Sequence, residues 1–436
     1  MPIKFKSKIA CVALLLLGCN FVNAQEGAYS SYSPYSIFGM GDICRQGTAY
    51  NLSMGGTGIA SRNHRFINYL NPAAITARDT LSFMMDFGLV GEGKLYRQGD
   101  IKSASNLLNI SNVAFTVPIY KKSAFVAGIS PYSSMGYDFS HDITDPSLIG
   151  SVGNINYRSY GEGGVYQIFA GGAATFWNKL SVGAQFLYYF GNIDKSTIMN
   201  FSESSYRDVY SGYILNLNAI GGNFGVQYEQ ALPSGLSLTV GATYKTSSKL
   251  KGYVTDYKYA TVSSVTDTLK YKTDTLSHGS NVKLASEYGV GIALKKGDRW
   301  RAEFNYTRSD WRNSNLENVI GFANAGDAKF STTYSQSFRA GFEIVPNPND
   351  IRYYMRRCSY RAGAYYNRDY YKLDGKDVNS FGITLGITFP VFRWYNGVSI
   401  GVDLGQRGTN SGTMIRERYA KLVISFNIHD IWFQKP

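Results

Sequence analysis

The chain has 436 residues, of which 46 are Gly, 35 are Tyr and only 17% are charged. An apolar content of 44% excludes a disordered chain, and so much Gly and Tyr fits poorly with a helical bundle. The formal charge is +13, but Lys and Arg are scattered, which favours a solvated surface or anionic lipid heads over nucleic acid. Residues 12–17 form a short apolar block, and no later run reaches the roughly 20 residues of a membrane helix. These features indicate an all-β protein.

The N-terminus has the layout of a secretory signal. Three lysines precede the apolar stretch 9–18, and small residues lead to a predicted cleavage between Ala24 and Gln25. The alternative is a lipoprotein signal, because Leu-Leu-Gly precedes Cys19. In both cases the mature chain leaves the cytoplasm, and residues 1–24 are expected to be removed or processed.

Apolar and small polar residues alternate with period two along much of the chain, most clearly in 236–244, 381–389, 398–404 and 422–428. This period predicts strands with one apolar and one polar face. The polar face carries mostly Gly, Ser, Thr and Asn, whereas the solvated face of a sandwich is usually rich in charges. The apolar face is rich in Tyr and Phe, as on the lipid-facing side of a transmembrane β-barrel. We therefore expect an antiparallel barrel in the bacterial outer membrane.

Short and long connections alternate between the predicted strands. The short ones lie near 121–122, 177–179, 230–234, 295–298, 346–350 and 393–396, and the long ones near 92–110, 140–154, 195–208, 250–278, 310–327, 369–377 and 406–414. Seven long loops and six short turns predict about fourteen strands within 81–436, with both termini in the periplasm. The last strand ends near Trp432-Phe433, which suits recognition by barrel-assembly machinery.

Residues 25–80 do not alternate and are predicted to form a hatch, or plug, inside the barrel. A fourteen-stranded barrel is too wide for wall side chains alone to fill its lumen. The hatch contains two motifs, whose residues are Gly55, Gly56 and Gly58 in the first and Asn71, Pro72 and Ala73 in the second.

These two motifs resemble the N-terminal hatch of the FadL/OmpP1/TodX family of outer-membrane transport proteins. The Ser-Pro-Tyr-Ser opening at 33–36 and the Trp-Phe-x-Lys ending at 432–435 resemble the variant common in Bacteroidota. The resemblance implies a channel that admits hydrophobic small molecules, such as fatty-acid-like or aromatic compounds. It also implies that the hatch moves and that the ligand can leave sideways through the barrel wall.

One position in the wall is a candidate for such a lateral gate. Leu215, Leu217 and Ala219 share one face, and the apolar face then changes sides around Gly221 and Gly222. We interpret this as a one-residue slip, which implies a bulge or kink there. The alternative is a bulge that only adjusts the curvature of the wall.

Several charged residues fall on the polar, lumen-facing side of predicted strands. They are Arg301, Glu303, Arg339, Glu343, Arg361, Asp403 and Lys421. We interpret them as a buried network that holds the hatch, because unpaired charges in a narrow lumen are costly. A proton- or ligand-coupled path is the functional alternative.

The sequence does not favour an enzyme. The four histidines (His64, His141, His278 and His429) have no recognisable spacing to a Ser or Asp, and Gly-x-Ser-x-Gly does not occur. No metal-ligand cluster, cofactor motif or catalytic residue is predicted, and Cys44 and Cys358 are a candidate pair for a disulfide in an oxidising compartment.

Two functions therefore remain open. The first is a FadL-like channel for hydrophobic compounds, with outer-membrane lipid, lipopolysaccharide and the ligand as partners. The second is a non-transporting barrel subunit of a larger outer-membrane complex for secretion or assembly, in contact with other outer-membrane proteins. An apolar groove that runs from the outer loops into the lumen would favour the first function.

Overall fold

The computed structural model describes residues 32–78, 82–120, 122–147, 153–203, 205–262, 265–276, 281–322, 324–325, 328–392 and 396–431. The signal segment 1–24 with Ala24 and Gln25, His278 and Trp432-Phe433 lie outside these ranges, and the predictions about them remain predictions. Among the described residues, no helix is both long and apolar enough to cross a membrane.

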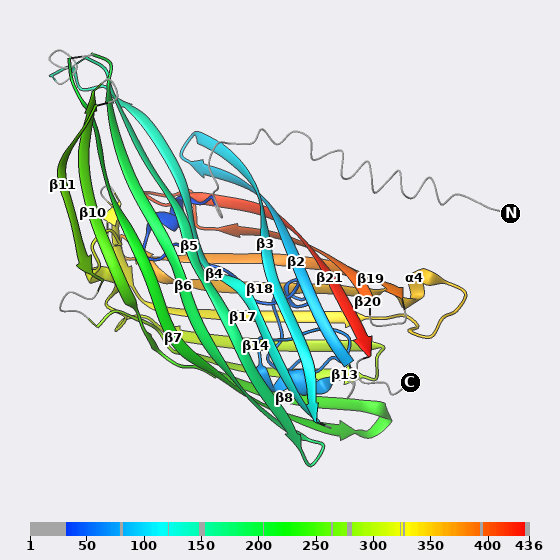
Figure 1. Cartoon of the computed structure of the whole chain (residues 1–436). Helices are drawn as coiled ribbons and strands as arrows, with labels where there is room; N and C mark the ends of the chain where they lie inside the picture. Colours follow the sequence, from blue (N-terminus) through cyan, green and yellow to red (C-terminus); the bar gives the residue numbers. More distant parts are fainter. Residues whose placement is uncertain are drawn as a thin grey trace.

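Within the described residues, fourteen antiparallel strands close into a barrel, as the sequence predicts (Figure 1). The strands are β2 (Ser82–Gln98), β3 (Ile101–Tyr120), β4 (Ser123–Ile143), β5 (Ile155–Phe176), β6 (Leu180–Phe201), β7 (Asp208–Leu232), β8 (Leu236–Lys245), β13 (Glu287–Lys296), β14 (Trp300–Asp310), β17 (Tyr334–Ile344), β18 (Ser359–Leu373), β19 (Lys376–Phe392), β20 (Asn396–Arg407) and β21 (Arg416–Ile431). The ladder between β2 and β21, from Ser82↔Ile431 to Arg97↔Arg416, closes the cylinder.

The alternation seen in the sequence separates an apolar outer face from a polar lumen. On β8, Val240 is 50% exposed on the outside, whereas its neighbour Thr239 is buried on the inside. On β20, Val402 and Leu404 lie outside and the carboxylate between them, Asp403, is buried inside. The outer face therefore meets lipid and the inner face hydrogen-bonds within the lumen.

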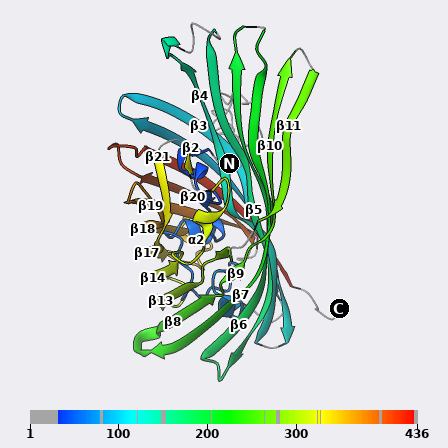
Figure 2. The ribbon, with the colours of Figure 1, turned by 90° about the vertical axis from the view of Figure 1, so that its left-hand side faces the viewer.

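The wall is uneven in height (Figure 2). Strands β4 to β7 have 21 to 25 residues, whereas β8, β13, β14 and β17 have 10 or 11. The hairpin of β10 (Lys251–Val262) and β11 (Val265–Thr275) extends the tall side, because β10 pairs with the first half of β7. We call the end with these extensions the long-loop end, and the end with the β5–β6 turn at 177–179 the short-turn end.

Much of the predicted long-loop sequence is instead paired strand. The predicted loops 92–110, 250–278 and 369–377 lie largely in strands, and residues 195–201 of the predicted loop 195–208 belong to β6. The turn between β2 and β3 is reduced to Gly99-Asp100, with Gly99 at φ 59°. Those predictions were wrong because polar residues in a strand that projects beyond the bilayer look like loop residues in the sequence.

The predicted slip at Gly221 and Gly222 is also wrong. The β6–β7 ladder runs without a register shift from Leu180↔Tyr228 to Met199↔Val209. Leu215 and Leu217 are buried on the lumen side of β7, and on the other side of Gly221 the apolar residues face outward. The polarity of the two faces therefore changes along one regular strand, without a bulge. The partner strand does change there. Residues 208–218 of β7 pair with β10, and residues 223–232 pair with β8.

Residues 32–78, which we call the lumenal segment, lie inside the barrel (Figure 1, blue). The segment contains η1 (Pro34–Ile37), β1 (Asp42–Ile43), α2 (Ala49–Leu52) and η2 (Pro72–Ala77). It begins at the long-loop end, where the Tyr32 hydroxyl donates to the Asp138 carbonyl of β4, and it reaches the short-turn end before β2 begins. Whether it moves as a hatch remains a prediction.

The remaining elements are short and lie in connections. They are η3 (Pro233–Gly235), β9 (Ser248–Lys249), β12 (Lys283–Leu284), η4 (Leu316–Asn318), β15 (Asn324–Ala325), β16 (Ala328–Thr332) and α4 (Tyr354–Arg357).

Candidate functional site

The Asn71-Pro72-Ala73 motif caps a helix and presses against wall glycines. The Asn71 Oδ1 accepts from the Ala73 N–H at 3.0 Å and begins η2, while its Nδ2 donates to the Ile59 carbonyl at 2.7 Å. A Cβ at Gly225 on β7 would lie 2.0 Å from the Asn71 Oδ1, and one at Gly183 on β6 would lie 2.6 Å from the Pro72 carbonyl carbon. The motif therefore fits this wall only because glycine stands at both positions.

The first glycine motif makes a matching contact on the opposite wall. Gly55 and Gly56 have φ of 72° and 83°, a region that favours glycine, and the Gly55 N–H donates to the Thr384 Oγ1 at 2.8 Å. A Cβ at Gly363 on β18 would lie 2.3 Å from the Gly55 nitrogen, and one at Gly58 would lie 2.6 Å from Leu70 Cδ1. The contact between Gly55 and β18 is therefore shaped for close backbone approach, whereas Gly58 makes room for Leu70 within the lumenal segment.

Arg301 on β14 binds three groups of the lumenal segment. It donates to the Tyr50 hydroxyl at 2.7 Å, to the Ser61 Oγ at 3.1 Å and to the Arg62 carbonyl at 2.9 Å. Its guanidinium also lies 3.8 Å from Glu343 on β17. Burial raises the pKa of the Tyr50 hydroxyl, which stays neutral and donates to the Glu343 carboxylate at 2.7 Å.

The other charges predicted to face the lumen, except Lys421, also contact the lumenal segment. Glu303 accepts from the Ala60 N–H at 2.9 Å, and the Arg361 guanidinium lies 5.0 Å from the centre of the Tyr50 ring. Asp403 accepts from Arg45. Arg339 donates to the Gly56 carbonyl at 3.1 Å, whereas Lys421, which was also predicted to face the lumen, pairs with Glu92 on the wall at 2.7 Å.

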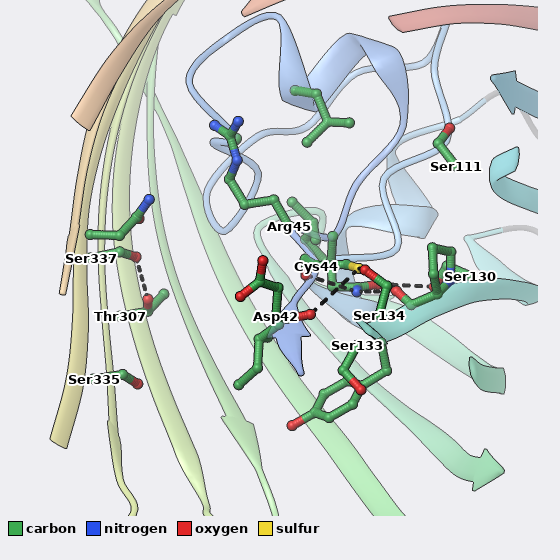
Figure 3. A pocket seen from close by; sticks show the side chains of 18 of the residues that line it. Asp42, Cys44, Arg45, Ser111, Ser130, Ser133, Ser134, Thr307, Ser335 and Ser337 are labelled. Carbon is green, nitrogen blue, oxygen red and sulfur yellow. Dashed lines mark hydrogen bonds between the residues drawn. The ribbon is translucent and has the colours of Figure 1, made fainter. Parts of the chain in front are cut away.

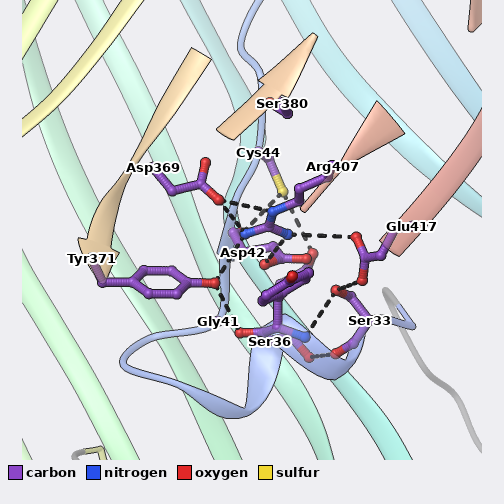
Figure 4. A network of polar contacts seen from close by, with 12 residues as sticks. Ser33, Ser36, Gly41, Asp42, Cys44, Asp369, Tyr371, Ser380, Arg407 and Glu417 are labelled. Carbon is purple, nitrogen blue, oxygen red and sulfur yellow. Dashed lines mark hydrogen bonds and ion pairs between the residues drawn. The ribbon is translucent and has the colours of Figure 1, made fainter. Parts of the chain in front are cut away.

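A second charged cluster is centred on Arg407 (Figure 4), the last residue of β20, which ends at the long-loop end. Arg407 contacts Asp42 at 2.7 Å, Asp369 at 2.6 Å and Glu417 at 3.8 Å. The Ser33 hydroxyl donates to Glu417 at 2.5 Å. The sequence does not predict this cluster, because Asp369 and Arg407 lie within predicted loops and Asp42 is far away in the chain.

The wall is split between β3 and β4. These strands pair only from Val113↔Ile129 to Tyr120↔Ser123, although β3 continues to Ile101 along β2 and β4 continues to Ile143 along β5. The register of β4 against β5 also shifts between Pro131 and Ser133. Beyond the break, β1 of the lumenal segment pairs with Ser133 and Ser134 on the free edge of β4.

A cavity of about 760 Å³ lies behind this split (Figure 3). Leu108, Ile110 and Ile129 line it at the wall, and Arg45 and Arg339 are among its polar lining residues. The lining therefore combines apolar side chains at the split with charged side chains in the lumen.

The histidines and cysteines are dispersed. His64 lies 4.0 Å from Asp298, while His141 and His429 belong to β4 and β21. Cys44 and Cys358 are both free, so the candidate disulfide between them is absent. No group of three or more His, Cys, Asp or Glu in the described ranges is placed to hold a metal ion.

Comparison with solved structures identifies the fold. The toluene transporter TbuX of Ralstonia pickettii matches with a TM-score of 0.57 and 14% identity, over 88% of this chain and 98% of that one. A FadL homologue of Pseudomonas aeruginosa matches with a TM-score of 0.57 and 11% identity, over 90% and 99%. The monoaromatic hydrocarbon channel CymD matches with a TM-score of 0.54 and 14% identity, over 89% and 98%. No curated protein sequence matches the chain.

Comparison with family models identifies the sequence family. The family model described as BamG matches residues 6–436. Because that match spans almost the whole chain, the protein belongs to the BamG family, and its fold is that of the FadL-like outer-membrane barrels.

Proposed function

We propose that this protein is a non-catalytic outer-membrane channel for hydrophobic or amphipathic small molecules, with a route through the barrel wall between β3 and β4. The break in the β3–β4 ladder carries the proposal, because the cavity in the lumen is lined by residues from both edges of that break. The fold shared with the toluene transporter TbuX and the hydrocarbon channel CymD supports it.

The fit of the lumenal segment favours a lateral route over an axial one. Wall glycines contact residues 54–73 on opposite sides, and Arg301 and Glu303 bind backbone groups of the same segment. An axial passage would require many of these contacts to break together, whereas a lateral passage requires movement only near β1 and the edge of β4.

The second candidate is a barrel subunit of a larger outer-membrane complex. The same close fit favours it, since a plug that is held on all sides needs no transport role, and the family name BamG points to this function. In that case the tall side of the barrel, with β10 and β11, offers surface to protein partners beyond the bilayer.

One experiment separates the two. A tagged copy is purified from native membranes in mild detergent, and intact complexes are analysed by mass spectrometry of protein and lipid together. Recovery as a single chain with an apolar molecule bound supports the channel. Recovery in a fixed ratio with other outer-membrane proteins and without a ligand overturns it in favour of the subunit.

Uptake provides the matching functional test. Cells that lack the protein are compared with complemented cells for uptake of toluene and of oleate. We expect complementation to restore uptake of at least one of the two, and equal uptake in both strains contradicts the channel.

A further inference from the structure

We infer that residues 350–357, which we call the interface turn, bind the anionic phosphates of the phospholipid leaflet at the short-turn end of the barrel. The turn joins β17 to β18 and contains α4, and it projects past the ends of the strands (Figure 1). The predicted orientation places this end in the periplasm. The inference concerns the outside of the barrel and applies to either function considered above.

The interface turn exposes large apolar side chains. Ile351 is 97% exposed and Met355 52% exposed, and Val391 near the end of the neighbouring β19 is exposed as well. Large apolar side chains that are exposed so close together mark a site of contact with a membrane or with a protein. The contacts of the turn with the wall distinguish between these two partners.

Two tyrosines fix the interface turn beside the lipid-facing side of the wall. The Tyr354 hydroxyl donates to the Pro390 carbonyl at 2.9 Å, and the Tyr360 hydroxyl donates to the Met355 carbonyl at 3.0 Å. Tyr360 lies opposite Ile344 in the β17–β18 ladder, and Ile344 is exposed on the outer face. Residues directly opposite each other share a face, so Tyr360 also faces the lipid. The turn therefore lies at the edge of the apolar band, where tyrosines meet the lipid head groups.

Three arginines and one carboxylate give the interface turn a positive charge. The guanidinium carbons of Arg352 and Arg356 lie 5.4 Å and 4.8 Å from the centre of the same ring, that of Tyr353. The guanidinium carbon of Arg357 lies 5.1 Å from the centre of the Tyr354 ring. The tyrosine rings thus gather the three cations in one place. A guanidinium group binds phosphate oxygens through paired N–H donors, so the turn complements a phosphate-bearing surface.

Asp350, the carboxylate of the interface turn, orders its backbone. The Asp350 Oδ1 accepts from the Arg352 N–H at 2.9 Å and from the Tyr353 N–H at 2.8 Å, as in an Asx turn. The Asp350 Oδ2 accepts from the Arg356 Nη1 at 3.3 Å. The arginines therefore stand on an ordered backbone, and binding a lipid phosphate requires little further ordering of the chain.

A phospholipid leaflet accounts for all of these features. Its phosphates match the arginines, its acyl chains begin beside Ile351 and Met355, and its head groups lie level with Tyr360 at the end of the apolar band. A protein partner would have to displace the lipid that surrounds the wall at this height. The contacts with the wall therefore favour lipid over protein.

Hydrogen exchange of residues 350–357 tests the inference on the full chain in nanodiscs. Nanodiscs of phosphatidylcholine alone are compared with nanodiscs that also contain a minority of phosphatidylglycerol. We expect exchange to slow about five-fold or more when phosphatidylglycerol is present, because each arginine near an anionic surface strengthens binding about five-fold. The double variant Arg352→Gln with Arg356→Gln should lose this difference between the two lipid compositions.

Two further double variants control the result. Arg352→Lys with Arg356→Lys keeps the charge and should keep the effect of phosphatidylglycerol. Arg207→Gln with Arg312→Gln removes the same formal charge from exposed residues at the long-loop end, and its exchange in residues 350–357 should equal that of the wild type. Because each variant is compared with itself in the two lipid compositions, any loosening of the turn by the substitution cancels from the ratio of exchange rates.

Equal exchange of the interface turn in the two lipid compositions overturns the inference. The alternative of a protein partner is tested by purifying tagged wild type and the Arg352→Gln, Arg356→Gln variant from native membranes. A periplasmic protein that is lost only from the variant, together with exchange that does not depend on phosphatidylglycerol, assigns the turn to protein docking instead. Neither readout depends on uptake by cells, so failure of the channel and failure of this inference are distinguishable.

Discussion

Replacing Gly225 by Ala tests whether the lumenal segment is held by the shape of the wall. The new Cβ would lie 2.0 Å from the Asn71 Oδ1, so that oxygen must move by about 1.4 Å to reach ordinary contact. Such a shift breaks the cap on η2, worth about 0.5–2 kcal/mol, and the bond from Asn71 to the Ile59 carbonyl, worth about 1 kcal/mol. We expect a loss of about 2–3 kcal/mol in the local stability of the segment, or about a 30- to 150-fold rise in its open population.

Hydrogen exchange of residues 47–78 in detergent measures this opening, since the exchange rate reports the free energy of local unfolding. Gly172→Ala on the lipid-facing side of β5 is the matched control, because a Cβ there meets only the Ala124 carbonyl oxygen at 3.5 Å. If the two variants exchange alike in residues 47–78, the wall glycines do not hold the segment and the reasoning fails.

The remaining predictions concern charges and thiols. Arg301→Met removes one partner of a buried ion pair and three hydrogen bonds, and should destabilise the lumenal segment by about 3–5 kcal/mol in the same exchange assay. The control is Arg308→Met, on the exposed face of the same strand, which should change the stability of the segment by less than about 0.5 kcal/mol. Lys195→Met deprives two backbone carbonyls of their ammonium donor and should speed exchange in residues 32–41, and an unchanged rate there would exclude this role. Because Cys44 and Cys358 are free, the thermal transition should be the same with and without reductant, and a shift with reductant would contradict the structure.

The fold could be predicted because each strand carries its own signal. Alternation in segments such as 398–404 marks strands, and the strands can be counted from the turns between them, without knowledge of long-range contacts. The signal fails where the wall rises beyond the bilayer. There the lumen is apolar, with Leu215 and Leu217 inside, so the same strand reverses its pattern and resembles a slip at Gly221.

The site could be predicted only in part, for a different reason. The face of a charge such as Arg301 or Asp403 follows from its place in a strand, but its partner does not, because Tyr50 and Arg45 are hundreds of residues away in the chain. The split between β3 and β4 was not predicted, because the sequence does not show where two neighbouring strands stop pairing. The register shifts beside it, at Gly88/Leu89 between β2 and β3 and at Pro131/Ser133 between β4 and β5, are visible only in the structure.

The position of the lumenal segment in the chain constrains the order of assembly. The segment immediately precedes β2, and β2 pairs with β21, the last described strand, over residues 82–97. A plug that packs against glycines on opposite walls enters most readily before that seam closes. We therefore expect the segment to lie among the strands already when the first and last of them meet, so that this barrel encloses its own N-terminal region as it is assembled.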